Sequence, residues 1–562
     1  MKQLRWQILV VVIALVLVGA LLLSQQPVVQ TILPQPSTGG VYTEALIGSM
    51  SRLNPLLDRN NHADRDVDRL LFSGLIKFDS RGIPFPDIAE SWGTSQDGTI
   101  YNFSIRPNAI WHDGQPVTTD DVIFTIELIK SDVSFYPQDV KALWNEVEVR
   151  RLDEKTMQFR LPEPFVPFLD YLTFGLLPQH ILGAVPADQI LNAEFNLNPV
   201  GSGPYKFDQL LVENGQIVGV SLSVFDDYYG GEPFIPQVVF RYYPSAPAAL
   251  DAYQQGEVLG ISQITQQILD EALAEQNLSL YTSRRPEMSL ILFNLGNGEV
   301  PFLQEVAVRE ALLMGINRQH MINELLRGQA IPADGPILPG SWAFYEGTEH
   351  IDYDPTAAVT ALKREGYVIP AEGGEVRVKD GQSLSFTLLH SDDPLHVAIA
   401  EYIQRDWAAL GVNVTLQALP YEQLVFQNLT NRQYQAALVD LNLSYTPDPD
   451  PYPFWHQAEA VGGQNYSQWD SRAASEYLER ARITADINER TRLYRNFQVI
   501  FAQELPALPL YFPTYTFAVD VQVNGVQAAP LYDTSDRLNH ISDWYLVTRR
   551  SIEPVTTEET TE

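Results

Sequence analysis

Residues 384–440 read LSFTLLHSDDPLHVAIAEYIQRDWAALGVNVTLQALPYEQLVFQNLTNRQYQAALVD. Apolar side chains recur at helical spacing within residues 397–410, and Gly411 follows as a helix stop. The stretch predicts three strands alternating with two helices, over residues 384–389, 397–410, 412–416, 422–429 and 435–440. Such a βαβαβ unit forms a partly parallel sheet covered on both faces, so the expected fold class is α/β.

The flanking sequence extends this architecture. Residues 306–326 predict one amphipathic helix that ends at Gly328, and residues 471–481 and 491–503 predict two more. Towards the N-terminus, residues 76–200 predict a small, strand-rich unit. Its expected elements are a half-buried strand over 99–106, a helix opened by Thr118 and Asp121, and a hairpin of residues 147–151 and 156–161.

The two ends of the chain differ from the body. Residues 8–23 are an unbroken apolar run preceded by Lys2 and Arg5, typical of a membrane anchor or a signal segment. We expect an uncleaved anchor, because no clean small-residue cleavage site follows the run, and the charge pattern places the body outside the cytoplasm. Residues 24–40 predict a non-helical tether, and residues 551–562 predict a disordered acidic tail.

Composition excludes several classes of function. The chain has 562 residues, a formal charge of −33 and no cysteine. A surface this acidic repels phosphate backbones, so we expect no nucleic-acid partner. The absence of cysteine excludes disulfides, thiolate catalysis and Cys-ligated metals. The common nucleotide-binding and hydrolase motifs are absent and the nine histidines are scattered, so we expect no catalytic residues, no metal site and no cofactor.

One segment does indicate a binding site. Asp448-Pro449-Asp450-Pro451 holds two carboxylates in a rigid, extended backbone that suits a loop lining a cleft; a turn with two solvated acids explains it equally well. Aromatic residues crowd around it, and flat rings with polar edges suit peptides or sugars. We expect roughly a third of them to face ligand and the others to pack in the core, among Tyr445, Tyr452, Phe454, Trp455, Tyr466 and Trp469.

Taken together, the chain resembles the extracellular solute-binding proteins of family 5, the peptide/nickel-binding proteins of ABC importers. The resemblance depends on the order and spacing of several short motifs over residues 41–550, because none of them is specific by itself. The motifs are Leu53-Asn54-Pro55-Leu56-Leu57, Asp87-Ile88-Ala89-Glu90-Ser91-Trp92, Trp111-His112-Asp113-Gly114, Gly201-Ser202-Gly203-Pro204-Tyr205, Phe293-Asn294-Leu295, Val308-Arg309-Glu310-Ala311-Leu312 and Asp448-Pro449.

The resemblance implies a bilobal periplasmic-binding-protein type II fold with an additional inserted domain. Lobe I would be discontinuous, over residues 41–75, 200–288 and 512–550, with the inserted domain at 76–199 and lobe II at 289–511. It further implies a non-enzymatic, monomeric protein that captures a peptide or other small solute between closing lobes and docks on an ABC permease in the membrane.

We expect the ligand-binding side chains to be Tyr136, Asn294, Ser444, Tyr445, Asp448, Asp450, Trp455 and Tyr511. Peptide-binding relatives often hold the ligand amine with an Asp just before the Asp-Pro motif, but residues 443–447 contain no acid. Asp448 or Asp450 would then take that role. An oligosaccharide ligand, a sensing role, or a secreted hydrolase using two carboxylates are the alternatives.

Overall fold

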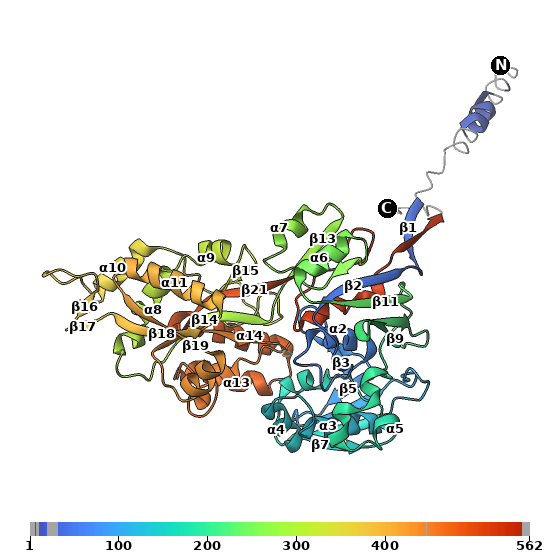
Figure 1. The fold of residues 1–562 in the computed structure, drawn as a ribbon, viewed down its shortest axis with the longest axis horizontal. Helices are drawn as coiled ribbons and strands as arrows, with labels where there is room; N and C mark the ends of the chain where they lie inside the picture. The colour runs from blue at the N-terminus through green and yellow to red at the C-terminus, as the bar shows by residue number, and fades with distance from the viewer. Residues whose placement is uncertain (1–5, 7–10, 20–31, 445–446, 553–562) are drawn as a thin grey trace.

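The computed structural model describes residues 6, 11–19, 32–444 and 447–552. Two lobes lie side by side (Figure 1). Residues 11–19 are helical. Within the described part of the chain, no helix is both long enough and apolar enough to cross a membrane. Much of the expected 8–23 segment, part of the 24–40 tether and Tyr445 lie outside the described residues.

A two-stranded ribbon joins the two ends of the body. Strand β1 (Ile32–Ser37) pairs antiparallel with β22 (Val547–Ile552), so both ends leave the molecule together (Figure 1). Strand β22 extends the ordered chain to residue 552, two residues into the expected disordered tail, because backbone pairing with β1 continues to that point. The remaining tail, residues 553–562, lies outside the described residues.

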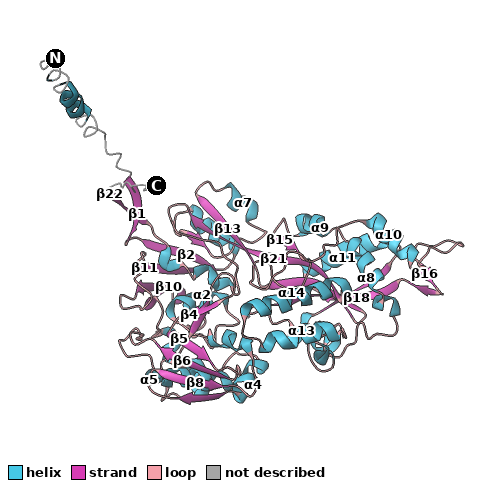
Figure 2. Ribbon diagram, turned by 180° about the vertical axis from the view of Figure 1, so that it is seen from behind, coloured by secondary structure: helices cyan, strands magenta, loops and turns pink. Residues whose placement is uncertain are grey.

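One long sheet runs through both lobes (Figure 2). Its central strand β21 (Ala507–Asp520) pairs first with β14 (Glu287–Phe293) and β15 (Ala330–Pro332), and then with β12 (Gly260–Ile261) and β13 (Leu278–Arg284). The backbone therefore passes between the lobes in the middle of β21 and also at residues 285–286, between β13 and β14.

The βαβαβ unit is confirmed. Strand β18 (Ser385–Ser391) pairs parallel with both β19 (Asn413–Leu419) and β20 (Ala436–Asn442). Helix α11 (Pro394–Leu410) links β18 to β19 and ends at Gly411, whose φ of 85° is the left-handed conformation that glycine adopts readily. A π-helical turn, η5 (Gln423–Leu429), leads to β20. The expected α/β fold class with mixed sheets is therefore correct.

Helices cover both faces of this half of the sheet. One hydrophobic core lies under α8 (Val306–Met314), α9 (Arg318–Leu325), α10 (Pro355–Arg364) and α11, and another under α13 (Arg472–Ile483) and α14 (Ile487–Glu504). The single helix expected over residues 306–326 was wrong. It is two helices, because α8 ends at Gly315 and the Asn317 side chain accepts the His320 N–H to begin α9.

The other lobe contains the remaining strands of the long sheet. These are β2 (Val41–Ile47), β9 (Tyr205–Glu213), β10 (Gln216–Val224) and β11 (Gln237–Tyr243). Its helices are α2 (His62–Leu71), α6 (Ala246–Gln254) and α7 (Leu269–Ala274).

A separate antiparallel sheet occupies the segment between α2 and β9. Its order is β5 (Ala89–Thr94), β6 (Ile100–Ile105), β8 (Thr156–Arg160), β7 (Glu148–Arg151). The expected strand, hairpin and Thr118–Asp121 capping box of α3 (Thr119–Lys130) are confirmed. One continuous hydrophobic core joins this sheet to the lobe that contains α2, so the domain boundaries stay a prediction.

The shorter elements connect these layers. They are β3 (Ile76–Phe78), β4 (Pro84–Pro86), α4 (Gln138–Glu146), α5 (Gln179–Leu182), β16 (Val378–Lys379), β17 (Gln382–Ser383), α12 (Tyr452–Trp455) and the 3-10 helices η1 (Val166–Leu172), η2 (Ala187–Asn192), η3 (Glu194–Leu197), η4 (Pro301–Gln304), η6 (Gln457–Ala460), η7 (Thr534–Leu538) and η8 (Ile541–Asp543).

Candidate functional site

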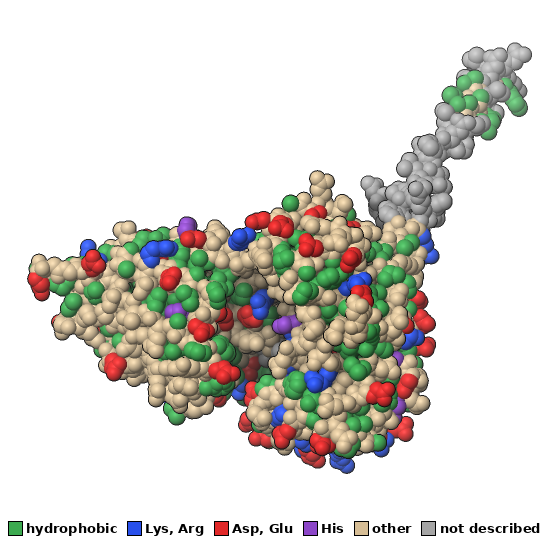
Figure 3. All heavy atoms as spheres, viewed as in Figure 1, with side chains coloured by type: hydrophobic (Ala, Val, Ile, Leu, Met, Phe, Trp, Pro, Cys, Tyr) green, Lys and Arg blue, Asp and Glu red, His purple; other side chains and the backbone are tan. Residues whose placement is uncertain are grey.

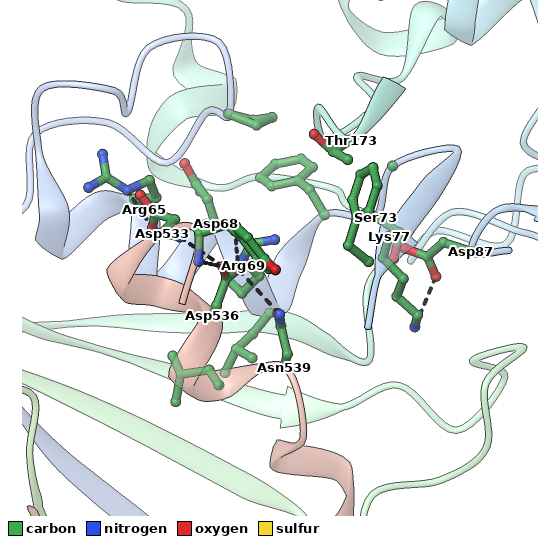
Figure 4. A pocket seen from close by; sticks show the side chains of 18 of the residues that line it. Arg65, Asp68, Arg69, Ser73, Lys77, Asp87, Thr173, Asp533, Asp536 and Asn539 are labelled. Carbon is green, nitrogen blue, oxygen red and sulfur yellow. Dashed lines mark hydrogen bonds and ion pairs between the residues drawn. The ribbon is translucent and has the colours of Figure 1, made fainter. Parts of the chain in front are cut away.

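A cavity of about 330 Å³ opens beside α2 (Figure 4). Its walls come from α2 and the chain after it, from Tyr136 and residues 173–175, from the C-terminal segment 529–542 and from Pro447. Segments that are distant in sequence therefore enclose one space. Figure 3 shows a deep groove between the two lobes with charged side chains on its walls.

Helix α2 contributes three charged side chains to the cavity. Asn61 caps the helix by accepting the Ala63 N–H at 3.0 Å, which fixes where the helix begins. From that start, Arg65, Asp68, Arg69 and Phe72, spaced by three or four residues, share the face that lines the cavity. All three charged side chains on that face are labelled in Figure 4.

Most charged groups in the cavity are paired. Arg65 contacts Asp533 at 2.9 Å, Arg69 contacts Asp536 at 3.0 Å, and Lys77 contacts Asp87 at 3.3 Å (Figure 4). The first two pairs attach α2 to the C-terminal segment. Since residues 533 and 536 lie in and beside η7, these ion pairs close one side of the cavity.

Two acids remain without such partners. Asp58 and Asp68 are buried, and they form no ion pair among the described residues. Burial raises the pKa of Asp58 above its ordinary value, although Arg65 opposes this rise. Burial and the neighbouring Asp58 carboxyl raise the pKa of Asp68. Two buried carboxyl groups in contact cannot both ionise easily, so they hold a proton near neutral pH.

A second polar surface lies on the sheet of the other lobe. The His396 ring contacts the Asp393 carboxylate at 2.6 Å and the Asp440 carboxylate at 3.2 Å. Ser289 donates its hydroxyl hydrogen bond to Asp440 from the neighbouring strand. Burial lowers the pKa of His396, but the two carboxylates more than compensate and raise it overall.

This polar surface lies near the carboxyl ends of β18 and β20, at the N-terminal end of α11. In open α/β sheets, ligands bind at such strand ends. Tyr511 belongs to the same surface: it pairs with Ser289 across β21 and β14. Burial raises the pKa of its hydroxyl group, so Tyr511 stays neutral.

The structure places the predicted site residues in different surroundings. Tyr136 lines the cavity and lies under the Arg59 guanidinium, 4.9 Å from the ring centroid. Asn294 is buried and donates to the carbonyls of Arg432 and Tyr434, so its amide is occupied within its own lobe. Ser444 follows β20 and is partly exposed.

The two aspartates of the Asp-Pro motif are not solvated. Asp448 is 6% exposed and contacts Arg490 of α14 at 2.5 Å, and Asp450 makes a bidentate contact with Arg482 of α13 at 2.9 and 2.7 Å. Both carboxylates therefore already have cationic partners. This corrects the expectation that they are available to replace the missing ligand-binding acid.

Trp455 is also committed to a contact within the protein. Its indole is 2% exposed and packs edge-on against Phe501, with ring centroids 4.8 Å apart. Trp469 packs on the same cluster. In this structure Trp455 is a core residue, which goes against the expectation that it contacts ligand.

The sequence analysis missed the charged face of α2. The signal was present, because residues 58–69 read DRNNHADRDVDR, with seven charged residues directly after the Leu53–Leu57 motif. Five of these, Asp58, Asp64, Arg65, Asp66 and Asp68, are buried. Among the described residues, no group of three acids or histidines is placed to hold a metal ion.

The two lobes share one long sheet, and each lobe carries a polar surface: the cavity beside α2 in one and the surface around His396 in the other. This arrangement defines a bilobal solute-binding protein of the type II periplasmic fold. Residues 84–463 match the family described as bacterial extracellular solute-binding proteins, family 5. The chain belongs to this family, whose members are extracytoplasmic binding proteins.

Curated relatives are similar in sequence to this chain over most of their length. The oligopeptide-binding protein AppA of Bacillus subtilis is 27% identical over 523 residues, which cover 91% of this chain and 92% of AppA. The dipeptide-binding protein of Escherichia coli is 26% identical over 471 residues, covering 79% and 84%.

Solved structures of related proteins have the same fold as this chain. AppA from Bacillus subtilis in complex with a nonapeptide matches with a TM-score of 0.65 and 25% identity, covering 91% of this chain and 100% of that one. HbpA2 from Haemophilus parasuis matches with a TM-score of 0.77 and 20% identity, covering 88% and 99%. The second match shows the fold alone.

Proposed function

We propose that this protein captures peptides outside the cytoplasm and delivers them to the membrane permease of an ABC importer. The observation that carries the proposal is the full-length similarity to AppA, a relative whose structure holds a nonapeptide. The protein would act as a monomer and without catalysis. Tyr136, Ser444, Tyr445 and Tyr511 remain the proposed ligand contacts from the sequence analysis.

The geometry supports capture between two lobes. The cavity beside α2 includes Pro447 from the other lobe, and the Trp342 N–H donates to the Arg81 carbonyl across the same boundary at 3.0 Å. In the described part of the chain, the backbone crosses between the lobes at residues 285–286 and within β21. A hinge at those crossings would open and close the groove.

The test is to identify what the protein carries. The full chain is purified without refolding, denatured, and the released small molecules are analysed by mass spectrometry. Peptides in the released fraction are expected, and the most abundant one, resynthesised, should bind the ligand-free protein in calorimetry. An oligosaccharide in place of peptides, or steady turnover of the added peptide, would contradict the proposal.

A further inference from the structure

Helix α2 carries five charged residues, and four of them have partners of opposite charge or hydrogen-bond donors. Arg65 and Arg69 pair with Asp533 and Asp536, as described above. Asp64 accepts the backbone N–H groups of Ser51 and Arg52 at 2.9 Å. Asp66 forms a buried ion pair with Arg537 at 2.6 Å. The fifth residue is Asp68.

Asp68 is 3% exposed, and neither of its carboxylate oxygens has a well-oriented hydrogen-bond partner among the described residues. Its nearest polar neighbours are the Asp58 carboxyl and the Asn54 backbone. A buried polar group without a partner is uncommon in folded proteins, because it has lost its water without compensation. Asp68 and Asp58 both line the cavity.

The charges that line the cavity indicate which kind of ligand group could pair with Asp58 and Asp68. Among the described lining residues are six aspartates, Asp58, Asp68, Asp79, Asp87, Asp533 and Asp536, and four cations, Arg59, Arg65, Arg69 and Lys77. With all six carboxyl groups ionised the lining is acidic by two charges, and it is acidic by one while Asp58 and Asp68 share a proton. Three of the four cations are already in ion pairs, and the fourth, Arg59, lies over the Tyr136 ring. This balance favours a positively charged group in the cavity over an anion.

We propose that Asp58 and Asp68 form a subsite for a cationic group of the bound ligand, an ammonium or a guanidinium. The inference rests on the proposed function, since it assigns the charge of the peptide that the protein prefers. Tyr136 lines the same cavity, with the Arg59 guanidinium over its ring. A peptide supplies such a group from its amino terminus or from a lysine or arginine side chain.

On binding, the cationic group of the ligand would replace the proton that Asp58 and Asp68 hold. The ligand keeps its own proton on nitrogen, and the proton held by the two carboxyl groups is released to solvent. The groups that face this pair are Asp64, Arg65 and Arg69 from α2, Asp533 from the C-terminal segment, Arg59 beside Tyr136, and Tyr242 from β11. Affinity for a cationic peptide should therefore rise with pH as the pair loses its proton.

Three peptides distinguish the sources of the cation. Tetra-alanine has a free amino terminus, N-acetyl-tetra-alanine has no cation, and N-acetyl-Ala-Ala-Lys-Ala has only a side-chain ammonium. Calorimetry of the full chain is run at pH 7 in two buffers with different ionisation enthalpies, which counts the protons released. We expect at least one cationic peptide to bind roughly 10- to 100-fold more tightly than N-acetyl-tetra-alanine, with proton release, on the scale of a charge-assisted hydrogen bond.

The double variant Asp58→Asn/Asp68→Asn should lose both the preference and the proton release, so that it binds the cationic peptides no more tightly than it binds N-acetyl-tetra-alanine. Asp270→Asn, which removes one carboxylate from an exposed side chain of α7, should keep both. If the double variant fails to fold, Asp68→Asn alone should weaken the preference. If the Asp58 and Asp68 variants keep the preference, or if the wild type binds all three peptides equally, the cation subsite is wrong but the proposed function stands. Binding of none of them overturns the proposed function as well.

Discussion

At the scale of single residues, the buried charge of Asp68 should reduce stability. Burial raises the pKa of its carboxyl group, so the folded state holds its proton more tightly than the unfolded state does. For such a group, stability is greatest at acidic pH and falls as pH rises above about 4. In the ligand-free protein, Asp68→Asn should raise the free energy of unfolding at pH 8 by about 1–3 kcal/mol, the scale of an unpartnered buried group.

Urea denaturation at pH 5 and pH 8 measures this effect. The gain should be larger at pH 8 than at pH 5, because the wild-type carboxyl group is charged more often there. The exposed Asp270→Asn variant should show no comparable gain. A variant that loses stability at both pH values would mean that Asp68 has a partner that stabilises its charged form.

The two aspartates of the Asp-Pro motif allow a matched comparison. Asp448 and Arg490 are both almost fully buried, so Asp448→Asn leaves an uncompensated guanidinium in the core. We expect a loss of about 3–5 kcal/mol in the free energy of unfolding. Asp450→Asn removes the same charge two residues away, but Arg482 is 24% exposed and can turn to water, so the loss should be smaller.

Denaturation of both variants, together with peptide calorimetry, separates structure from binding. A weaker affinity in Asp448→Asn without a loss of stability would restore the ligand-binding role that the sequence suggested for this residue.

At the scale of elements, the break between α8 and α9 depends on one cap. The Asn317 side chain accepts the His320 N–H at 3.0 Å, so Asn317→Ala should destabilise the protein by about 1 kcal/mol. Gln319→Ala, in the first turn of the same helix but without a capping bond, is the matched control. Thermal denaturation compares the two variants. Equal melting temperatures would show that packing of α9, and not its cap, fixes where the helix begins.

The elements also show what sequence can predict and what it cannot. The βαβαβ unit was predictable because its signals are local: helical spacing in α11, and a glycine at its end. The break at Gly315–Asn317 was missed because apolar residues such as Ile316 continue the helical pattern across it.

The site was less predictable than the fold. The sequence predicted Asp448 as a ligand contact, but its partner Arg490 lies 42 positions away, and the pairing reverses the interpretation of a free acid. Arg537 reaches Glu44 and Asp66 across 493 and 471 positions. No local pattern reports such pairings, so sequence could not tell which acids of α2 are left for a ligand.

At the scale of the whole molecule, binding should bring the lobes together. The crossings at residues 285–286 and within β21 are narrow, while each lobe has its own extensive hydrophobic core, so rotation between lobes is the motion of lowest cost. The chain has no cysteine, so introduced ones are the only sites for spin labels. Asp188→Cys and Glu372→Cys place exposed labels beyond the groove on opposite sides.

Pulsed electron resonance on this doubly labelled protein should give a shorter mean distance after saturation with the peptide identified by mass spectrometry. Labels at Glu372→Cys and Arg472→Cys, both exposed and both on the lobe that contains α11, should keep their distance. The reason is that closure rotates packed cores as rigid bodies, and packed cores resist continuous deformation. A distance that stays constant across the groove while the peptide is bound would mean that the ligand enters a groove already closed, and capture by lobe closure would then be wrong.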